Sequence, residues 1–383
     1  MKDIIISDDI IYIGADDKDL DLFESQYIVP NGVSYNSYVI LDEKIAVMDT
    51  IDTRKTDEWK ENLERVLDGR TPDYLVVSHL EPDHAGSIKE FADKYPEAKI
   101  VASAKAIAML PQFFEIADLA DRAVAVKEGE ELSLGSHTFQ FFMAPMVHWP
   151  EVMVEYEKSE KILFSADGFG KFGALDADEA RRYYFNIVGK YGAQVQALLK
   201  KAATLDIQTI CPLHGPILKE NLGYYIGKYM TWSSYEPEDD GVLVAYASIH
   251  GNTKKAAEKM KEILEAKGAK KVAITDLSRD DMAEAIEDAF RYDKLVLAAA
   301  SYDASVFPCM ETFLNKLTNK NYQNRKIAII ENGSWAPTAA RVMKGYVEKM
   351  KKITLCEKTV TIKSTMKDAD VTAMEELADE LLA

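Results

Sequence analysis

Short apolar runs alternate with polar turns and helical stretches in the first half of the chain. The segment 34–50 predicts a hairpin, because YVIL and KIAVMDT flank a polar Asp-Glu turn. The segment 56–69 has the apolar spacing of a helix and ends at a glycine. Further strand-like runs follow, namely YLVVSH, KIVAS, TFQFFMAP, VMVEYE, KILFSADG and IQTICPLHGP. This half is therefore predicted to be a strand-rich α/β domain.

The pattern becomes more regular after the acidic stretch YEPEDDG at 235–241, which we interpret as a linker. Five apolar runs follow, separated by helical patterns, and the first of these helices is expected to begin near Thr253. Such alternation predicts a doubly wound parallel sheet of five strands. We therefore predict two domains, residues 1–237 and residues 238–383.

Composition supports this division and excludes some classes of protein. A chain of 383 residues is too long for one ordinary core, and 47% hydrophobic with 29% charged residues is typical of a soluble globular protein. The net charge of −18 argues against a nucleic-acid partner. We find no membrane span and no secretion signal in the sequence. The three cysteines form no CxxC pair, so we expect a cytoplasmic protein without a disulfide framework.

The stretch SHLEPDHAGS, which follows the apolar run YLVV, carries four potential metal ligands. They are His79, Glu81, Asp83 and His84. We expect Pro82 to keep this loop out of a helix, so that neighbouring side chains can converge. A single histidine would more often be a cap or a surface group, but four candidates within six residues predict a metal site.

Three more candidate ligands stand in the same topological position farther along the chain. His148, Asp167 and His214 each lie just after an apolar run, where side chains from successive strands can gather at one edge of a sheet. His137 falls in a turn-like segment, and His250 belongs to the second half, so neither fits the pattern.

The order of these residues resembles the metallo-β-lactamase fold, whose loop motif is His-x-His-x-Asp-His followed by His, Asp and His. Glu81 stands where the zinc hydrolases usually carry a second histidine. Added carboxylates favour iron over zinc. Two ferrous ions bring four positive charges, which Glu81, Asp83, Asp167 and a bridging hydroxide would balance. The sequence therefore favours a pair of iron ions.

A second site is predicted where the first strand of the second half meets its helix. The segment SIHGNT offers backbone N–H groups and hydroxyls to a phosphate. It resembles the flavodoxin loop that holds the phosphate of FMN, although an ordinary helix cap is the alternative. The candidate residues are Ser248, Ile249, His250, Gly251, Asn252 and Thr253.

Two later loops, SYDASVFP and ENGSWAPTA, follow the third and fourth strands of this half and flank the expected ligand crevice. The candidate flavin contacts in them are Ser301, Tyr302, Asp303, Asn332, Gly333, Ser334 and Trp335. We expect Tyr302 and Trp335 to lie against the isoalloxazine ring, with core packing as the alternative for Trp335. Hydrogen bonds to the polar edge of the ring are expected from Ser301, Asn332 and Gly333.

A lactamase-like half with Glu81 in its motif, joined to an FMN-type flavodoxin half, resembles the flavodiiron proteins over essentially the whole chain. The resemblance implies an N-terminal metallo-β-lactamase-like αββα sandwich and a C-terminal flavodoxin-like doubly wound five-stranded parallel sheet. It implies that Asp167 bridges two irons. The first iron would be held by His79, Glu81 and His148, and the second by Asp83, His84 and His214.

The same resemblance implies further site residues. Tyr183 matches a tyrosine beside the metal ligands in the family, although the neighbouring Tyr184 leaves the register open. Glu24 stands where many members carry a histidine near the diiron pocket. The apolar residues Met146, Val147 and Trp149 are candidates for the pocket lining, with plain packing as the alternative.

For function, the resemblance implies an oxidoreductase that reduces dioxygen to water, nitric oxide to nitrous oxide, or both. Electrons would pass through FMN from a separate rubredoxin, or from a deazaflavin cofactor, because the chain ends near its last helix without a rubredoxin segment. A head-to-tail homodimer, or a dimer of dimers, would bring the flavin of one subunit close to the metals of the other.

Two other interpretations predict different observations. A zinc hydrolase with an appended flavodoxin would contain zinc and would keep its activity without FMN. An electron carrier whose first half is only a docking scaffold would contain no iron.

Overall fold

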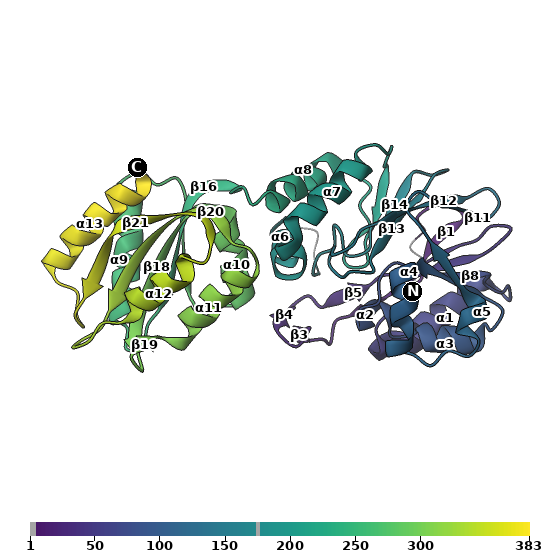
Figure 1. The fold of residues 1–383 in the computed structure, drawn as a ribbon, viewed down its shortest axis with the longest axis horizontal. Helices are drawn as coiled ribbons and strands as arrows, with labels where there is room; N and C mark the ends of the chain where they lie inside the picture. The colour runs from purple at the N-terminus through teal and green to yellow at the C-terminus, as the bar shows by residue number, and fades with distance from the viewer. Residues whose placement is uncertain (1–4, 174–176) are drawn as a thin grey trace. The chain divides into compact units, whose positions relative to one another are not determined.

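The computed structural model describes residues 5–173 and 177–383. Within them, contacts separate two compact units, shown as ribbons in Figure 1. The first unit extends to Tyr184 and includes Ala193–Met230, whereas the second contains Phe185–Gly192 and Thr231–Ala383. The separation of the domains between residues 237 and 238 stays a prediction.

Two sheets form the centre of the first unit. In spatial order the first sheet contains β1 (Ile10–Tyr12), β6 (Tyr38–Ile40), β7 (Ala46–Met48), β8 (Tyr74–Val77), β9 (Lys99–Ser103) and β10 (Ala123–Val126). The second contains β11 (Glu131–Ser133), β12 (Thr138–Met143), β13 (Met153–Glu157), β14 (Ile162–Phe164) and β15 (Thr209–Cys211). The predicted hairpin is confirmed, since β6 and β7 pair antiparallel.

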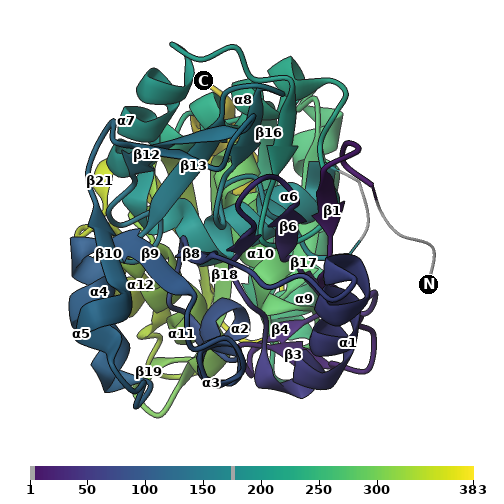
Figure 2. The same ribbon diagram turned by 90° about the vertical axis from the view of Figure 1, so that its right-hand side faces the viewer.

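The core of the first unit lies between these sheets. Met48, Val76 and Val101 of the first sheet share one buried apolar cluster with Phe141 and Phe164 of the second. Helices cover the outer faces, as in an αββα sandwich. They are α1 (Thr56–Leu67), α3 (Ile88–Lys94), α4 (Ala104–Met109), α5 (Leu119–Arg122), α6 (Ala177–Tyr183), α7 (Gly192–Ala202) and α8 (Leu222–Ser233). In Figure 2, α4 and α5 lie beside β9 and β10.

The predicted helix in the segment 56–69 shows how the local sequence sets these elements. Trp59, Leu63 and Leu67 recur at every fourth position of α1 and are buried on one face. The helix ends where Asp68 takes a left-handed conformation with φ of 45°, which short polar side chains tolerate. Gly69 follows with φ of 82° and turns the chain towards β8.

The second unit is a doubly wound sheet, as predicted. Its parallel strands are β17 (Val272–Asp276), β16 (Asp239–Ala247), β18 (Tyr292–Tyr302), β20 (Gln323–Asn332) and β21 (Lys351–Ile362), with short β19 (Ser305–Val306) antiparallel to β18. One face carries α9 (Asn252–Ala266) and α13 (Asp368–Leu382). The other helices are α10 (Met282–Arg291), α11 (Pro308–Asn319) and α12 (Ala339–Val347).

The predicted linker at 235–241 is too long at its C-terminal end, because β16 begins at Asp239. Acidic residues are rarely placed in strands, but here the charge of Asp239 is balanced. Its carboxylate oxygens lie 2.8 Å from Arg291 Nε and 2.8 Å from Lys271 Nζ. These ion pairs let an acidic segment join the sheet.

Candidate metal and flavin sites

The SHLEPDHAGS stretch lies at the carboxyl end of β8, where the chain leaves the sheet. Ser78 N donates a 2.8 Å hydrogen bond to Asp49 Oδ1, which fixes the exit from the strand. The expectation that Pro82 keeps this loop out of a helix is wrong. Pro82 begins the one-turn helix α2 (Pro82–Ala85), because its fixed φ and missing N–H suit the first helical position.

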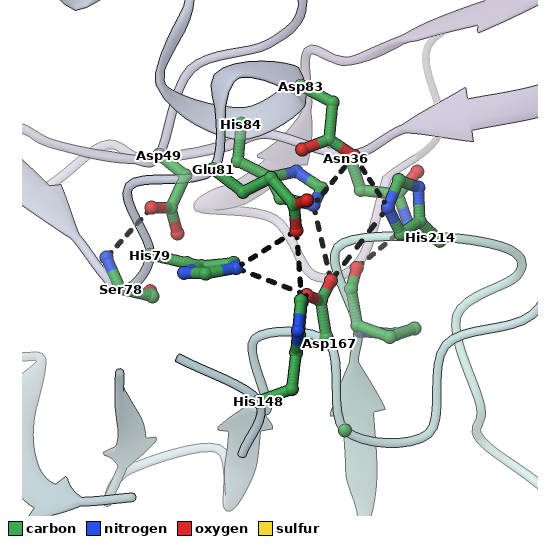
Figure 3. Close-up of polar contacts among 12 residues, drawn as sticks. Asn36, Asp49, Ser78, His79, Glu81, Asp83, His84, His148, Asp167 and His214 are labelled. Carbon is green, nitrogen blue, oxygen red and sulfur yellow. Dashed lines mark hydrogen bonds and ion pairs between the residues drawn. The ribbon is translucent and has the colours of Figure 1, made fainter. Parts of the chain in front are cut away.

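The structure brings all seven candidate ligands together in two groups (Figure 3). They come from four segments that follow β8, β12, β14 and β15. The first group contains His79, Glu81, His148 and Asp167, and the second contains Asp83, His84 and His214. Within each group, one potential ligand atom from every residue lies within 4.8 Å of the others.

Asp167 lies between the two groups and turns one oxygen toward each. Its Oδ2 is 3.0 Å from His148 Nε2 and 3.4 Å from His79 Nε2. Its Oδ1 is 3.2 Å from His84 Nε2 and 3.8 Å from His214 Nε2. A carboxylate in this position has the arrangement of a ligand that bridges two metal ions.

The hydrogen bonding around the site tests whether a metal pair fits. Both oxygens of Asp83, both ring nitrogens of His84 and Oδ1 of Asp167 are buried without a hydrogen bond among the described residues. Leaving such groups buried and unsatisfied costs about 1–3 kcal/mol each. Cations between these atoms would satisfy them, and the mixture of imidazoles and carboxylates suits iron. The residues therefore fit a dinuclear iron centre.

The electrostatics of the first group link metal binding to proton release. Burial lowers the pKa of His148, but hydrogen bonds to Asp167 and Glu81 raise it to about 9. Burial raises the pKa of Glu81, while hydrogen bonds from His148 and His79 lower it to about 2. At neutral pH the metal-free pair therefore holds a proton on the imidazole. A metal ion must displace that proton when it binds His148.

Two partners orient the imidazoles, and the sequence did not mark them. His79 Nδ1 donates a 2.8 Å hydrogen bond to Oε1 of the buried Glu151, which leaves Nε2 facing Asp167. His214 Nδ1 donates at 2.8 Å to the backbone oxygen of Ser34. Such partners fix the tautomer and the ring orientation of metal-binding histidines. In the sequence, Glu151 is marked only by being an acidic residue three positions after the candidate ligand His148, which is a weak signal.

Aromatic rings pack against the second group. The centroid of the buried Tyr183 ring is 5.7 Å from that of His214, and Phe23 makes an edge contact with the same imidazole at 5.3 Å. Tyr184 contacts Tyr229 at 5.0 Å instead. Of the two adjacent tyrosines, Tyr183 is therefore the one beside the site. Phe23 was not among the sequence candidates.

Glu24 follows Phe23 in the exposed turn between β3 (Leu22–Phe23) and β4 (Tyr27–Ile28). Gln26 Nε2 donates a 3.1 Å hydrogen bond to Glu24 Oε2. Desolvation and the neighbouring Glu81 carboxylate raise the pKa of Glu24. The electric field of the first ligand group therefore reaches this carboxyl.

The three apolar candidates for the pocket lining have different surroundings. Trp149 is half-buried, and its ring centroid is 5.2 Å from that of His79. Val147 is buried, whereas Met146 is half-buried. Trp149 is thus the one that contacts a candidate ligand through its ring.

In the second unit, a cavity of about 560 Å³ opens at the carboxyl ends of β16, β18 and β20. Twelve of the thirteen sequence candidates line it. They are Ser248, Ile249, His250, Asn252, Thr253, Ser301, Tyr302, Asp303, Asn332, Gly333, Ser334 and Trp335. Gly251 is not in the lining but lies within the same loop, so the three predicted loops meet at one cavity.

The first of these loops has the geometry of an anion site. Gly251 adopts φ of 88°, which favours glycine, and donates from its N–H to Ser248 Oγ at 3.1 Å. The helix α9 begins at the next residue, Asn252, so its unpaired N–H groups face the loop. The residues present therefore fit a phosphate at this end of the cavity.

The expected hydrogen bonds to the flavin ring stay predictions. Gly333 N donates to Ile362 O at 3.0 Å, and the amide of Asn332 donates to Ser364 O at 2.8 Å, so these bonds hold the loop after β20 at the cavity. Ser301 Oγ accepts bonds from the first turn of α12 and keeps its own hydrogen to donate. The alternative of core packing for Trp335 is excluded, because the residue is 92% exposed.

Comparison with known proteins agrees with this architecture. Residues 33–215 match the ODP family beta lactamase model, and residues 243–367 match a flavodoxin domain model. A protein of Methanocaldococcus jannaschii is 32% identical over 289 residues, which cover 72% of each chain. A nitric oxide reductase of Moorella thermoacetica is 27% identical and covers 99% of this chain and 98% of its own.

Solved structures extend the likeness to the whole chain. The rubredoxin oxygen:oxidoreductase of Desulfovibrio gigas superposes with a TM-score of 0.94 at 25% identity, covering 100% of this chain and 98% of that one. A flavoprotein of Thermotoga maritima gives a TM-score of 0.89 at 25% identity, covering 100% and 98%. The flavodiiron protein of Giardia intestinalis, at 22% identity, shares the fold with a TM-score of 0.92, covering 100% and 96%.

A metal-binding lactamase-like unit joined to a flavodoxin-like unit defines a class of two-site redox proteins. The chain belongs to the flavodiiron proteins, a family of oxidoreductases that reduce nitric oxide or dioxygen. The prediction of family, fold class and enzyme class is thereby confirmed, and a hydrolase or a mere docking scaffold does not agree with it. Among the described residues, no helix is long and apolar enough to cross a membrane.

Proposed function

We propose that the chain reduces dioxygen to water, nitric oxide to nitrous oxide, or both, at a non-haem diiron centre supplied with electrons through FMN. The observation that carries the proposal is the placement of Asp167, whose two oxygens face two separate groups of buried ligands. A single metal ion would leave one of those groups unsatisfied.

We assign the ligands from the two groups. One iron would be held by His79, Glu81 and His148, and the other by Asp83, His84 and His214, with Asp167 available to both. Bound as a ferrous pair, the metals supply two electrons and two neighbouring positions for gas molecules, and reduced FMN supplies two more electrons. Dioxygen needs four electrons to become two waters, whereas two nitric oxide molecules need two to become nitrous oxide and water.

The chain's own residues orient the ligands and limit access. Glu151 and the backbone of Ser34 hold two imidazoles in place. We place Tyr183 and Glu24 at the edge of the reaction pocket, as polar side chains near the two ligand groups. Trp149 and Phe23 cover the imidazoles of His79 and His214.

The electron donor in this proposal is rubredoxin or another small soluble carrier, with a deazaflavin cofactor as the alternative. Support comes from relatives whose names include rubredoxin, namely the Desulfovibrio gigas enzyme and the anaerobic nitric oxide reductase flavorubredoxin of Vibrio vulnificus. A head-to-tail homodimer in a reducing cytoplasm completes the proposal. Free Cys211 and Cys356 are both buried, as suits a protein that needs no disulfide.

The experiment that tests the proposal uses the full chain, assayed for iron and FMN. The protein is reduced anaerobically by rubredoxin and its reductase, and consumption of dioxygen and of nitric oxide is then measured in parallel. We expect turnover with at least one gas, proportional to iron content and lost when FMN is removed. Iron-loaded, FMN-loaded protein that consumes neither gas would contradict the proposal.

A further inference from the structure

The two groups of ligands differ in the hydrogen-bond partners of their imidazole Nδ1 atoms. In the first group, His79 Nδ1 donates to a carboxylate, Oε1 of Glu151, at 2.8 Å. In the second group, His214 Nδ1 donates to a neutral backbone carbonyl at 2.8 Å. The Nδ1 of His84 is buried without a hydrogen bond among the described residues. Among the described residues, the first metal position therefore has an imidazole hydrogen-bonded to a carboxylate outside the ligand set, and the second position has no such hydrogen bond.

Glu151 is held firmly enough to act on His79. Its side chain is fully buried, and Oε1 also accepts a 3.0 Å bond from Leu80 N, in the same loop as the histidine. Its backbone oxygen accepts a 2.7 Å bond from Ser103 Oγ, at the end of β9. Glu151 thus ties the loop after β8 to the loop that carries His148.

The second carboxylate oxygen of Glu151, Oε2, is buried without a hydrogen bond in the described part of the chain. Among the described residues, no lysine or arginine forms an ion pair with Glu151, and its side-chain hydrogen bonds go to His79 and to Leu80 N. An imidazole that donates to a carboxylate is a stronger electron donor through its other nitrogen. That other nitrogen, His79 Nε2, faces Glu81 and Asp167.

We propose that Glu151 is a positioning residue that makes the two metal positions unequal. The metal held through His79 is bound more tightly, and is oxidised more easily, than the metal held through His84 and His214. The inference rests on the proposed diiron function. The inference ranks the two metal positions: the position supported by Glu151 retains its iron longer and is oxidised first.

The test compares Glu151→Gln with wild type in the full chain, loaded anaerobically with ferrous iron and FMN. A chromophoric ferrous chelator then removes the metal while its release is followed by absorbance. Wild type should release iron in two phases of equal amplitude. In Glu151→Gln the slow phase should become roughly 10–100-fold faster, the range expected when such an outer partner is lost, and the fast phase should not change.

A reductive titration provides a second readout, the reduction potentials of the metal pair. A loss of packing alone would not change one potential and leave the other in place. Wild type should show two separate potentials for the metal pair. Removing the negative charge of Glu151 should raise the lower potential and leave the upper one in place. Glu151→Asp, which keeps the charge on a shorter side chain, should restore most of the slow phase and most of the separation.

Glu155→Gln is the control for replacing a carboxyl group by an amide, at a second buried glutamate close by. Because burial raises the pKa of Glu155 well above its ordinary value, this control tests the change of group and not the loss of a charge. Glu155 Oε2 accepts a 3.0 Å bond from Ser78 Oγ, and among the described residues Glu155 makes no hydrogen bond with an imidazole. This variant should keep both phases and both potentials. An equal effect of Glu155→Gln, or an unchanged slow phase in Glu151→Gln, would overturn the inference. If Glu151→Gln does not fold, a single fast phase and a single potential in Glu151→Asp would overturn it equally.

The outcomes separate this inference from the proposed function. Wild type that binds no iron, or binds it and consumes neither gas, contradicts the function itself. Wild type that turns over gas but releases both irons in one phase, unaffected by Glu151→Gln, contradicts only the inequality of the two positions.

Discussion

Individual side chains in this protein show how one residue type takes different roles in different surroundings. His79 and His148 face carboxylates inside a metal site, whereas His137 lies in a turn and joins two acidic side chains. Its Nδ1 is 2.9 Å from Asp42 Oδ2, and its Nε2 is 3.3 Å from Glu160 Oε1. His137 therefore has a structural role, and its contribution to stability depends on pH.

The sign of that pH dependence follows from the two pKa shifts. Burial lowers the pKa of His137, but hydrogen bonds to Asp42 and Glu160 raise it above its ordinary value. Burial raises the pKa of Asp42, while hydrogen bonds from His137 and the backbone lower it. The contribution of His137 is complete below its unfolded pKa of about 6.5 and is lost as pH rises through the raised value. The contribution of Asp42 to stability is present above its unfolded pKa of about 4 and is lost as pH falls through its lowered pKa in the folded protein.

We therefore predict that His137→Gln lowers the stability of the protein most between about pH 4 and pH 6.5. The cost there should be about 1.5–3 kcal/mol, the value of a hydrogen bond to a charged group. Thermal melting of wild type and variant at several pH values measures it. The difference should narrow as pH rises towards 9, and a difference that stays constant or widens would show that the ion pair is not the cause.

How much of the site the sequence predicts also depends on single residues. All seven candidate ligands gather as two groups, because each follows a strand and the strand ends meet at one edge. The sequence analysis missed Glu151 and Phe23, because their roles depend on contacts with residues far away in the chain. Glu151 contacts His79, which is 72 positions away, and Phe23 contacts His214, which is 191 positions away. Local spacing carries no information about such partners.

Secondary-structure elements were predicted well where a strong apolar period is present and less well at their ends. The alternation of the second half predicted its five-stranded parallel sheet, but the boundary of β16 was misplaced, because ion pairs of Asp239 override its poor strand propensity. Pro82 was assigned to a loop although the same residue is suited to the first turn of α2. At both positions, the local sequence is compatible with two conformations, and tertiary contacts determine which one forms.

The start of α9 allows a prediction about flavin binding. Thr253 lies buried in the first turn of this helix, beside the cavity. Thr253→Ala should weaken FMN binding roughly tenfold or more, since a lost hydrogen bond to a charged phosphate costs about 1.5–3 kcal/mol. Fluorescence titration of deflavinated protein with FMN measures the affinity. Iron content should not change.

The control for this prediction is Thr372→Ala, which removes a hydroxyl from the first turns of another helix of the same unit. Thr372 Oγ1 donates to Asp368 O at 3.2 Å in α13, and Thr372 does not line the cavity. Its FMN affinity should equal that of wild type. Equal weakening by both substitutions, or none by Thr253→Ala, would remove the support for a phosphate site at α9.

The molecule as a whole holds a metal site in one unit and a flavin cavity in the other. In the proposed head-to-tail dimer, electrons pass from the flavin of one subunit to the metals of its partner. Two variants with complementary defects test this arrangement. His148→Ala should lack iron and keep FMN. Asn252→Glu places a carboxylate at the proposed phosphate site, and an acidic residue in the first turn is compatible with a stable helix.

Each variant alone should be inactive, whereas subunit exchange between them should restore part of the gas consumption. Native mass spectrometry shows whether mixed dimers have formed, and a mixture of His148→Ala with His148→Ala,Asn252→Glu serves as control. Mixed dimers that remain inactive would contradict electron transfer between subunits.

The central claim is that Asp167 lies between two iron ions, each held by one of the two ligand groups. Anomalous diffraction from a crystal of the anaerobically purified protein, recorded on both sides of the iron absorption edge, tests it most directly. The account predicts two iron peaks in the first unit, one beside His79, Glu81 and His148 and one beside Asp83, His84 and His214. A single peak, or peaks that disappear just below the zinc edge, at energies still above the iron edge, would contradict it.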